Sequence, residues 1–280
     1  MEDKGLAREL DRYTLIERSI TKKYRKEIWN PFIKAIKDYE LIKSGDNIAV
    51  CISGGKDSML MALLFKILHK RSEVPFNLKY IAMNPGYNEK NLLKIKENAE
   101  ILGIDLEIFD SEIFSITEKI SESPCYLCAR MRRGYLYSEA KSKGLNKIAL
   151  GHHFDDVIET TLLGMFYGSQ LQGMMPKLHS TNFQGMELIR PLYCIHEEDI
   201  IAWARYNSLE FIRCACSVSE KDEAMENGSK RKEIKELIKS LKKINPEIDR
   251  NIFNSIHAVC LDTFPRYKTG GKECNFLERY

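Results

Sequence analysis

The sequence of 280 residues contains no hydrophobic run long enough to cross a membrane. Its most apolar window, MLMALLFKIL at 59–68, is about half the ~20 residues that a transmembrane helix needs. The first ten residues, MEDKGLAREL, are charged and lack the apolar stretch and the cleavage site of a secretory signal. Internal repeats and low-complexity tracts are also absent. We therefore expect a folded cytoplasmic protein without a membrane partner.

A large excess of charge is absent as well. The 43 Lys and Arg residues against 40 Asp and Glu residues give a net charge of +3, which by itself does not predict nucleic-acid binding. Basic residues do gather locally, in TKKYRK, RMRR, SKRKE and KSLKK. Each cluster alone is typical of a solvated helix face. Only a position beside a catalytic site would favour contact with RNA.

Apolar segments alternate with amphipathic segments through the middle of the chain. Strands are expected at 46–53, 77–84, 105–110 and 147–153, and helices at 58–69, 90–102 and 155–167. This alternation predicts an α/β fold with a parallel sheet covered by helices on both faces. Helical spacing before and after it predicts three parts, a helical region at 1–45, a core at 46–194 and a mostly helical region at 195–280. Later helices are expected at 196–207, 229–243 and 247–261.

The stretch SGGKDS at 53–58 stands between an expected strand and an expected helix. It is not a Walker loop, which has four residues between its first glycine and its Gly-Lys pair. Gly54 and Gly55 nevertheless let backbone N–H groups approach phosphate oxygens, and the helix start adds positive potential. Lys56 can neutralise phosphate charge, and the two serines can donate hydrogen bonds. The sequence therefore predicts a polyphosphate-binding loop, with a plain capped turn as the structural alternative.

A second polar stretch, GHHFDD at 151–156, follows the last expected strand of the core. Asp155 and Asp156 could hold Mg²⁺ against phosphate oxygens, because Mg²⁺ prefers carboxylate and phosphate ligands. His152 or His153 could donate to phosphate or bind a metal. The alternative is that Asp155 caps a helix and one histidine only packs. Because ligands of parallel sheets gather at the carboxyl ends of the strands, we expect this stretch to meet SGGKDS at one crevice.

Eight cysteines are spread along the chain. Cys125 and Cys128 have the C-x-x-C spacing that lets two thiolates converge on zinc, an iron–sulfur cluster or a disulfide. A second C-x-x-C is lacking, so a four-thiolate zinc ribbon is not indicated, but RCACS after another apparent strand supplies Cys214 and Cys216. Three thiolates on a cubane cluster would leave one iron open for sulfide. The apolar surroundings of Cys51, Cys194 and Cys260 predict core positions, and Cys274 has no assigned role.

SGGKDS, PCYLCARMRRG, GHHFDDVIETTLLG and RPL occur in this order and resemble the tRNA-thiolating branch of the PP-loop ATP pyrophosphatases, above all the 2-thiocytidine synthetases. The resemblance covers about 46–217. It implies a PP-loop fold of the adenine nucleotide alpha hydrolase type and an enzyme that cleaves ATP to AMP and pyrophosphate. It further implies a 4Fe-4S cluster on three cysteines and replacement of the C2 oxygen of an anticodon-loop cytidine by sulfur. The implied partners are tRNA, a sulfur donor such as a cysteine desulfurase or free sulfide, and a second copy in a homodimer.

The chain departs from the family pattern in its later cysteine segment. Family members have C-x-x-C there and this chain has C-A-C, so the third cluster ligand, Cys214 or Cys216, stays open. The arginines of RMRR could stabilise the adenylate or bind RNA phosphate. Motifs and resemblance together predict catalytic roles for Lys56, Asp57, Asp156 and Arg132, ATP contacts from Ser53, Gly54, Gly55, Lys56, Asp57, Ser58, Met83, His152 and Asp155, and metal ligands among Cys125, Cys128, Cys214 and Cys216.

Three other functions are compatible with parts of this pattern. The enzyme could thiolate a different base, as 2-thiouridine enzymes do, although their terminal zinc-binding cysteine pairs are absent here. It could use ammonia as the nucleophile, but 280 residues leave little room for a glutaminase domain and the cysteines would have no purpose. A noncatalytic metal-binding RNA-binding module would leave SGGKDS and GHHFDD without a role.

Overall fold

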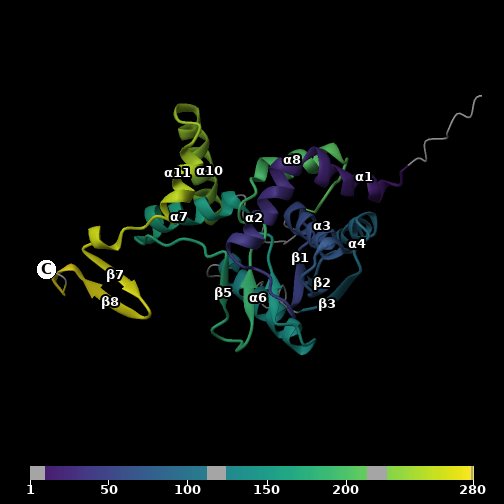
Figure 1. Ribbon diagram of the computed structural model, residues 1–280, viewed down its shortest axis with the longest axis horizontal. Helices are drawn as coiled ribbons and strands as arrows, with labels where there is room; N and C mark the ends of the chain where they lie inside the picture. The colour runs from purple at the N-terminus through teal and green to yellow at the C-terminus, as the bar shows by residue number, and fades with distance from the viewer. Residues whose placement is uncertain (1–9, 112–123, 213–225, 279) are drawn as a thin grey trace, which may run out of the picture. The chain divides into compact units, whose positions relative to one another are not determined.

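Figure 1 shows the computed structural model, which describes residues 10–111, 124–212, 226–278 and 280, with the backbone alone at 124–129 and 226–229. The chain divides into two compact units. Unit 1 consists of Met1–Val157 with Met174–Lys230, and unit 2 of Ile158–Gly173 with Arg231–Tyr280. Both boundaries expected from sequence, at 45/46 and 194/195, fall within unit 1, and the three expected domain ranges stay a prediction.

Unit 1 is built on a six-stranded sheet with the strand order β3-β2-β1-β4-β6-β5. All neighbouring strands are parallel except the edge strand β5, which is antiparallel to β6. The predicted α/β class with a parallel sheet is confirmed. The strands are β1 (Asn47–Ile52), β2 (Asn77–Asn84), β3 (Leu106–Asp110), β4 (Lys147–Ala149), β5 (Lys177–His179) and β6 (Glu187–Ile189).

The direction of each crossover decides which face of the sheet a helix of unit 1 covers. The chain moves outward from β1 to β3 and then returns past β1 to β4, so the direction reverses between β1 and β4. Because crossovers between parallel strands are right-handed, helices before and after this reversal cover opposite faces. The helices are α3 (Lys56–Arg71), α4 (Glu89–Ile101), α6 (Pro124–Ser142), α7 (Phe154–Gly168, continuing into unit 2) and α8 (Glu197–Tyr206). The reversal point is where ligands bind in such sheets.

The N-terminal helical segment covers α3 on its side away from the sheet. It consists of α1 (Arg12–Arg18), π-helical turns at Ser19–Lys23 and Arg25–Trp29, and α2 (Asn30–Asp38). Phe32 is fully buried and meets the Phe65 ring edge-on, with the ring centroids 5.9 Å apart, as is typical of aromatic pairs. Helix α8 is tied to the same segment, because Trp203 Nε1 donates to Ser19 Oγ at 3.1 Å. Helix α3, which carries the predicted loop at its start, is therefore enclosed by apolar contacts along most of its length.

A buried lysine joins the strands at the end of the sheet opposite the loop. Lys147 begins β4, and its side chain is only 3% exposed. Its ammonium lies 2.8 Å from Asp46 Oδ2 and 3.0 Å from Glu187 Oε2, and it donates to the Leu41 carbonyl at 3.1 Å. A buried charge is tolerated when it is paired and hydrogen-bonded in this way. These contacts hold the starts of β1, β4 and β6 together.

Replacing Lys147 with alanine is expected to lower the free energy of unfolding by about 3–5 kcal/mol, because Asp46 would stay buried without its cation. Urea denaturation measures this change. The control is Lys94→Ala on α4, whose ion pair with Glu97 at 3.1 Å is exposed and should contribute less than about 1 kcal/mol. Equal losses in the two variants would show that Lys147 does not brace the sheet.

Unit 2 contains the second part of α7, helix α10 (Glu226–Ile244) from Arg231 onward, α11 (Ile248–Ser255) and a hairpin of β7 (Arg266–Thr269) and β8 (Lys272–Asn275). Glu159 of α7 is buried and lies 3.1 Å from Arg231 Nε and 3.6 Å from Lys235 Nζ. Gly270 and Gly271 have φ angles of +55° and +78°, which a two-residue hairpin turn requires. Unit 2 thus combines helices linked by side-chain ion pairs with a small exposed hairpin.

Several expected elements differ from the structure. The last helix ends at Ser255 and not near 261, and the hairpin was not expected. The segment before RCACS was expected to be a strand. The described residues 207–212 follow the end of α8 and do not pair with the sheet, so this expectation is wrong for them. Within the described ranges, no helix combines the length and the apolar character that spanning a membrane requires.

Candidate nucleotide-binding site

The stretch SGGKDS forms a tight corner between β1 and α3. The Ser58 hydroxyl accepts a hydrogen bond from the Ser53 N–H at 3.1 Å and donates to the Gly55 carbonyl at 3.0 Å. Ser53 Oγ also lies 3.1 Å from Ser58 Oγ. Gly55 precedes the helix and has no side chain with which to cap its first N–H groups. Ser58 therefore braces the loop itself, and its expected contact with phosphate stays a prediction.

The two glycines of the loop meet different physical requirements. Gly54 has a φ of +85°, and a Cβ there would lie 2.6 Å from Ile95 Cγ1 and 2.7 Å from Ile212 Cδ1. Glycine is thus needed both for the backbone conformation and for the close approach. Gly55 has a φ of −76°, and among the described residues its Cβ would meet nothing closer than Ser53 Oγ at 3.7 Å. A side chain would therefore fit at Gly55 without a clash, since these distances are ordinary van der Waals contacts, and steric need for glycine is shown at Gly54 alone of the two.

Lys56 and Asp57 begin α3 as an oppositely charged pair. Lys56 Nζ lies 3.2 Å from both carboxylate oxygens of Asp57 and 2.9 Å from Glu197 Oε1. Burial lowers the pKa of Lys56, but the two carboxylates outweigh burial and raise this pKa overall. Burial raises the pKa of Asp57, although Lys56 opposes the shift. Asp57 Oδ1 is buried and accepts no hydrogen bond from the described residues, which leaves this oxygen suited to a further donor or cation.

The stretch GHHFDD forms the start of α7, and its polar groups cap two helices. Asp156 Oδ2 accepts from the His153 N–H at 3.1 Å, and His153 Nδ1 accepts from the Asp156 N–H at 3.4 Å. This arrangement is a reciprocal cap, with an imidazole in the place usually taken by a hydroxyl. Asp155 Oδ2 accepts from the Glu197 N–H at 2.7 Å and so holds the first residue of α8. Both aspartates thus have structural contacts in addition to the Mg²⁺ role predicted for them.

The fit of Mg²⁺ to this site depends on the phosphates. Within the described part of the chain, no three or more His, Cys, Asp or Glu side chains are grouped so that they could hold a metal ion by themselves. Mg²⁺ commonly binds one or two carboxylates, waters and substrate phosphates together. The carboxylates of Asp57, Asp155 and Asp156 are compatible with that mode but do not make a closed protein cage.

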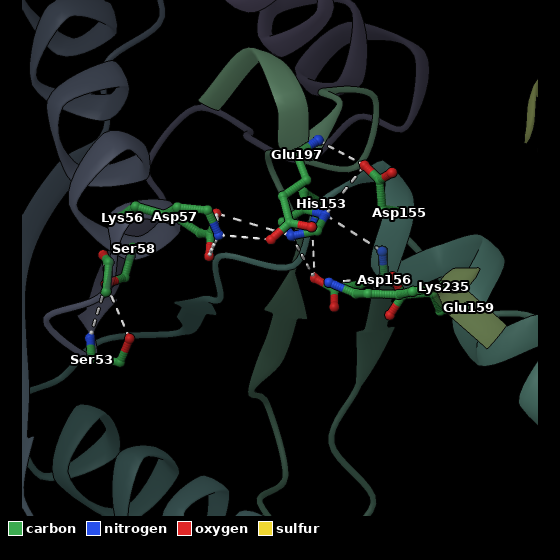
Figure 2. A network of polar contacts seen from close by, with 11 residues as sticks. Ser53, Lys56, Asp57, Ser58, His153, Asp155, Asp156, Glu159, Glu197 and Lys235 are labelled. Atoms are coloured by element: carbon green, nitrogen blue, oxygen red, sulfur yellow. Dashed lines mark hydrogen bonds and ion pairs between the residues drawn. The ribbon is translucent and has the colours of Figure 1, made fainter. Parts of the chain in front are cut away.

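SGGKDS and GHHFDD meet at the sheet reversal, as predicted. A Cβ on Gly151 would lie 3.1 Å from the backbone nitrogen of Ser58, so the two segments approach at backbone distance. His153 Nε2 lies 4.0 Å from Asp57 Oδ1. Figure 2 shows the polar contacts that run from Lys56 and Asp57 to His153 and the aspartates that follow it. The convergence of these segments is confirmed.

A pocket of about 260 Å³ opens beside this network. Six of the predicted site residues line it, and they come from the loop, β2, α6 and the start of GHHFDD. Apolar side chains complete its wall, so the pocket offers an apolar surface for a flat ring beside polar groups for an anion. Its lining consists of Cys51, Ile52, Ser53, Asp57, Ser58, Met83, Tyr87, Arg132, Leu136, Leu150, Gly151 and His152.

Other predicted site residues lie beside the pocket without lining it. Gly54 and Lys56 belong to the loop, and Asp155 and Asp156 belong to the polar network next to it. Gly55 is likewise outside the lining. The structure therefore gathers the predicted nucleotide-site residues in one region of unit 1, while their individual roles stay predictions.

Three residues near the site were not predicted as site residues. Glu197 pairs with Lys56, and the Tyr87 hydroxyl donates to the Ser53 carbonyl at 3.4 Å. Arg190, from the RPL motif after β6, is 7% exposed, and burial together with the charge of Arg133 lowers its pKa to about 10. Tyr87 and Arg190 follow strands at the carboxyl-end edge of the sheet, a position that sequence could have signalled. No local feature of the sequence marked Glu197 as a site residue.

The predicted cysteine ligands cannot be placed in the same way. Cys125 and Cys128 belong to α6, but their side chains lie outside the described residues, and Cys214 and Cys216 lie outside them altogether. Of the remaining cysteines, Cys51 is buried and Cys194 is half-buried. The core position predicted for Cys260 is wrong, since this residue is exposed after α11, where the expected helix has already ended.

The strand order, the glycine loop at the reversal point and the adjoining pocket define a nucleotide-binding α/β domain with a phosphate-binding loop. A model of the PP-loop domain matches residues 16–223. The chain belongs to the PP-loop family and, within it, to the branch represented by the tRNA-cytidine 2-sulfurtransferases. The family resemblance predicted from the four motifs is confirmed.

Relatives and a solved structure support this placement. The chain is 40% identical over 231 residues to the tRNA-cytidine(32) 2-sulfurtransferase of Methylobacillus flagellatus, covering 80% of this chain and 72% of the relative. It is 38% identical over 279 residues to the enzyme of the same name from Photobacterium profundum, covering 92% and 87%. The solved structure of the U34-tRNA thiolase NcsA from Methanococcus maripaludis with its [4Fe-4S] cluster matches with a TM-score of 0.64 and 23% identity, over 82% of this chain and 77% of that one. This last similarity is one of fold.

Proposed function

We propose that the protein is an ATP-dependent tRNA sulfurtransferase that replaces the C2 oxygen of cytidine 32 with sulfur. The observation that carries the proposal is the pocket, because Ser53 and Asp57 of the loop, His152 of GHHFDD and Arg132 of α6 line one cavity. The relatives that match at 38–40% identity over most of the chain are named for this reaction. Their names favour cytidine over the uridine of the more distant solved structure.

ATP fits the pocket by the chemistry of its lining. The N–H groups at the start of α3 suit phosphate oxygens, and Lys56 at that helix start would supply a cation for them. Met83 and Leu150 offer apolar surface to the adenine ring. Mg²⁺ would be held by phosphate oxygens together with a carboxylate of the network, for which Asp155 and Asp156 are the proposed ligands.

The proposed reaction has two steps. The C2 oxygen of cytidine attacks the α-phosphorus of ATP, the bond from that phosphorus to the bridging oxygen breaks, and pyrophosphate leaves. Sulfide then forms a bond to C2, and the C2–O bond breaks, so that AMP leaves with the original oxygen. Arg132 lines the pocket and would stabilise the negative charge that develops on the α-phosphate in the first step.

The proposed sulfur site is on the helix that also reaches the nucleotide pocket. Cys128 and Cys125 precede Arg132 by four and seven residues in α6, which places their backbone positions about 6 Å and 10 Å away along the helix axis. Together with Cys214 or Cys216 they would hold a 4Fe-4S cluster, the group that the solved NcsA structure is described as containing. Bound there, the cluster would supply sulfide at an iron that lacks a protein ligand.

tRNA is the proposed macromolecular partner, and a cysteine desulfurase or free sulfide is the proposed sulfur source. The exposed side chains of Arg130 and Arg133 flank Arg132 on α6 and could bind RNA phosphate beside the pocket. A cytoplasmic location and a homodimer, both expected at the level of the sequence, are part of the same proposal.

Two measurements test the proposed function. Turnover of anaerobically reconstituted protein with ATP, sulfide and tRNA should release AMP and pyrophosphate. Release of ADP and phosphate would reject the chemistry. Nucleoside analysis of tRNA from a strain lacking the gene should show loss of 2-thiocytidine. Normal 2-thiocytidine with loss of another thionucleoside would keep the class of enzyme and reject the substrate.

A further inference from the structure

The cation expected to bind phosphate is paired with carboxylates and does not line the pocket. Asp57 and Ser58 line the pocket, but Lys56 does not. Its ammonium instead donates to Glu197 Oε1 at 2.9 Å (Figure 2). The two side chains are 26% and 25% exposed, so their attraction is screened less than that of a surface pair. In this arrangement the charge of Lys56 is already compensated by a carboxylate.

Glu197 is held in place from behind. It is the first residue of α8, and its backbone N–H donates to Asp155 Oδ2 at 2.7 Å. Asp155 is itself in the first turn of α7, so Glu197 is positioned by the segment that forms the other half of the site. Because the backbone supplies this contact, a change of the Glu197 side chain leaves the link between α7 and α8 intact.

We propose that Glu197 occupies the Lys56 ammonium in the ATP-free protein and is displaced from it by a phosphate group of ATP, so that Glu197 sets the affinity for ATP. The inference rests on the proposed function in taking ATP as the ligand. A phosphate carries more negative charge than one carboxylate and competes for the same ammonium. The binding of ATP therefore includes the loss of one half-buried ion pair. Glu197 is a positioning residue, since it acts on the ligand through Lys56.

The test is calorimetric titration with Mg²⁺ and α,β-methylene ATP, which cannot be cleaved between the α and β phosphates. Glu197→Gln should lower the dissociation constant about three- to ten-fold, because Lys56 then keeps Asp57 as its charged partner and no longer has to leave Glu197. Glu198→Gln is the matched control. It removes the same charge one residue further along α8, where the side chain is exposed and makes no ion pair with the described residues. Its dissociation constant should stay within about two-fold of the wild-type value.

A double-mutant cycle separates the ion pair from a general charge effect. In a Lys56→Ala background, Glu197→Gln should leave the dissociation constant unchanged, since the partner of Glu197 is gone. Steady-state kinetics give an independent measure, because Glu197→Gln should lower KM for ATP without raising kcat. Thermal unfolding of each variant shows whether the fold is retained.

Two outcomes would overturn the inference separately. If wild-type protein binds the analogue and Glu197→Gln binds it equally well or more weakly, Glu197 does not compete with ATP. If Glu197→Gln and Glu198→Gln tighten binding alike, the effect is one of net charge and the ion pair is not its cause. Absence of binding to the wild-type protein and all variants would instead reject the proposed ATP site, and the inference with it.

Discussion

Replacement of Lys56 with alanine is expected to reduce the rate of AMP and pyrophosphate formation by about 10²–10³-fold, because the loop loses a cation that would stabilise charge on the phosphates during transfer. The effect on folding should be small. Lys56 is part of a partly exposed ion pair, and its removal leaves the hydrogen bonds of Ser53 and Ser58 that shape the loop. Asp57→Ala should likewise lose activity and keep the fold. Pyrophosphate release in the presence of tRNA measures the rate, and urea denaturation measures the stability.

Lys70→Ala is the matched control for Lys56. Lys70 lies near the other end of the same helix and is also ion-paired, with Glu17 at 3.2 Å, but it is far along α3 from the loop. Its loss should leave the rate of pyrophosphate release near the wild-type value. If both lysine variants retained that rate, the loop would not be the phosphate site.

Replacement of Cys125 or Cys128 with alanine is expected to abolish both the iron–sulfur cluster and the transfer of sulfur to tRNA. Two thiolates are too few to hold a cubane with only one open iron, so each loss should release the iron. After anaerobic reconstitution, the iron content should fall from about four per chain in the wild-type protein to background in these variants. Loss of the brown colour is the visible sign. A colourless wild-type protein that binds zinc would reject the cluster.

Variants of Cys214 and Cys216 test how many irons of the cluster are bound by protein ligands. Loss of the cluster on replacement of only Cys214 or only Cys216 agrees with three protein ligands and one open iron. If both are essential, all four irons are bound by protein and the open-iron sulfur site is wrong. If neither matters, the ligand set fails and Cys274 becomes the next candidate. Cys260→Ala is the control, because this exposed residue belongs to unit 2 and should not affect the cluster.

Some of the differences between expectation and structure had a signal in the sequence. The Gly-Gly pair between Thr269 and Lys272 is typical of a two-residue hairpin, and the structure has that hairpin where a polar tail was expected. Other differences had none. The segment before RCACS is apolar enough for a strand, but a strand needs a free sheet edge beside it, and the described residues 209–212 pair with none. The local sequence pattern does not show whether such an edge is available.

The sequence by itself determined the α/β alternation, the loop and its meeting with GHHFDD. These follow from local rules, since hydrophobic periodicity specifies the elements and the carboxyl ends of parallel strands share one edge. Only the tertiary structure decided which charges meet. Glu197 contacts Lys56 across 141 positions of sequence, and Lys147 is enclosed by Asp46 and Glu187. Such pairs depend on strand order and on how α8 is placed against α3 and α7, and no local pattern encodes these distances.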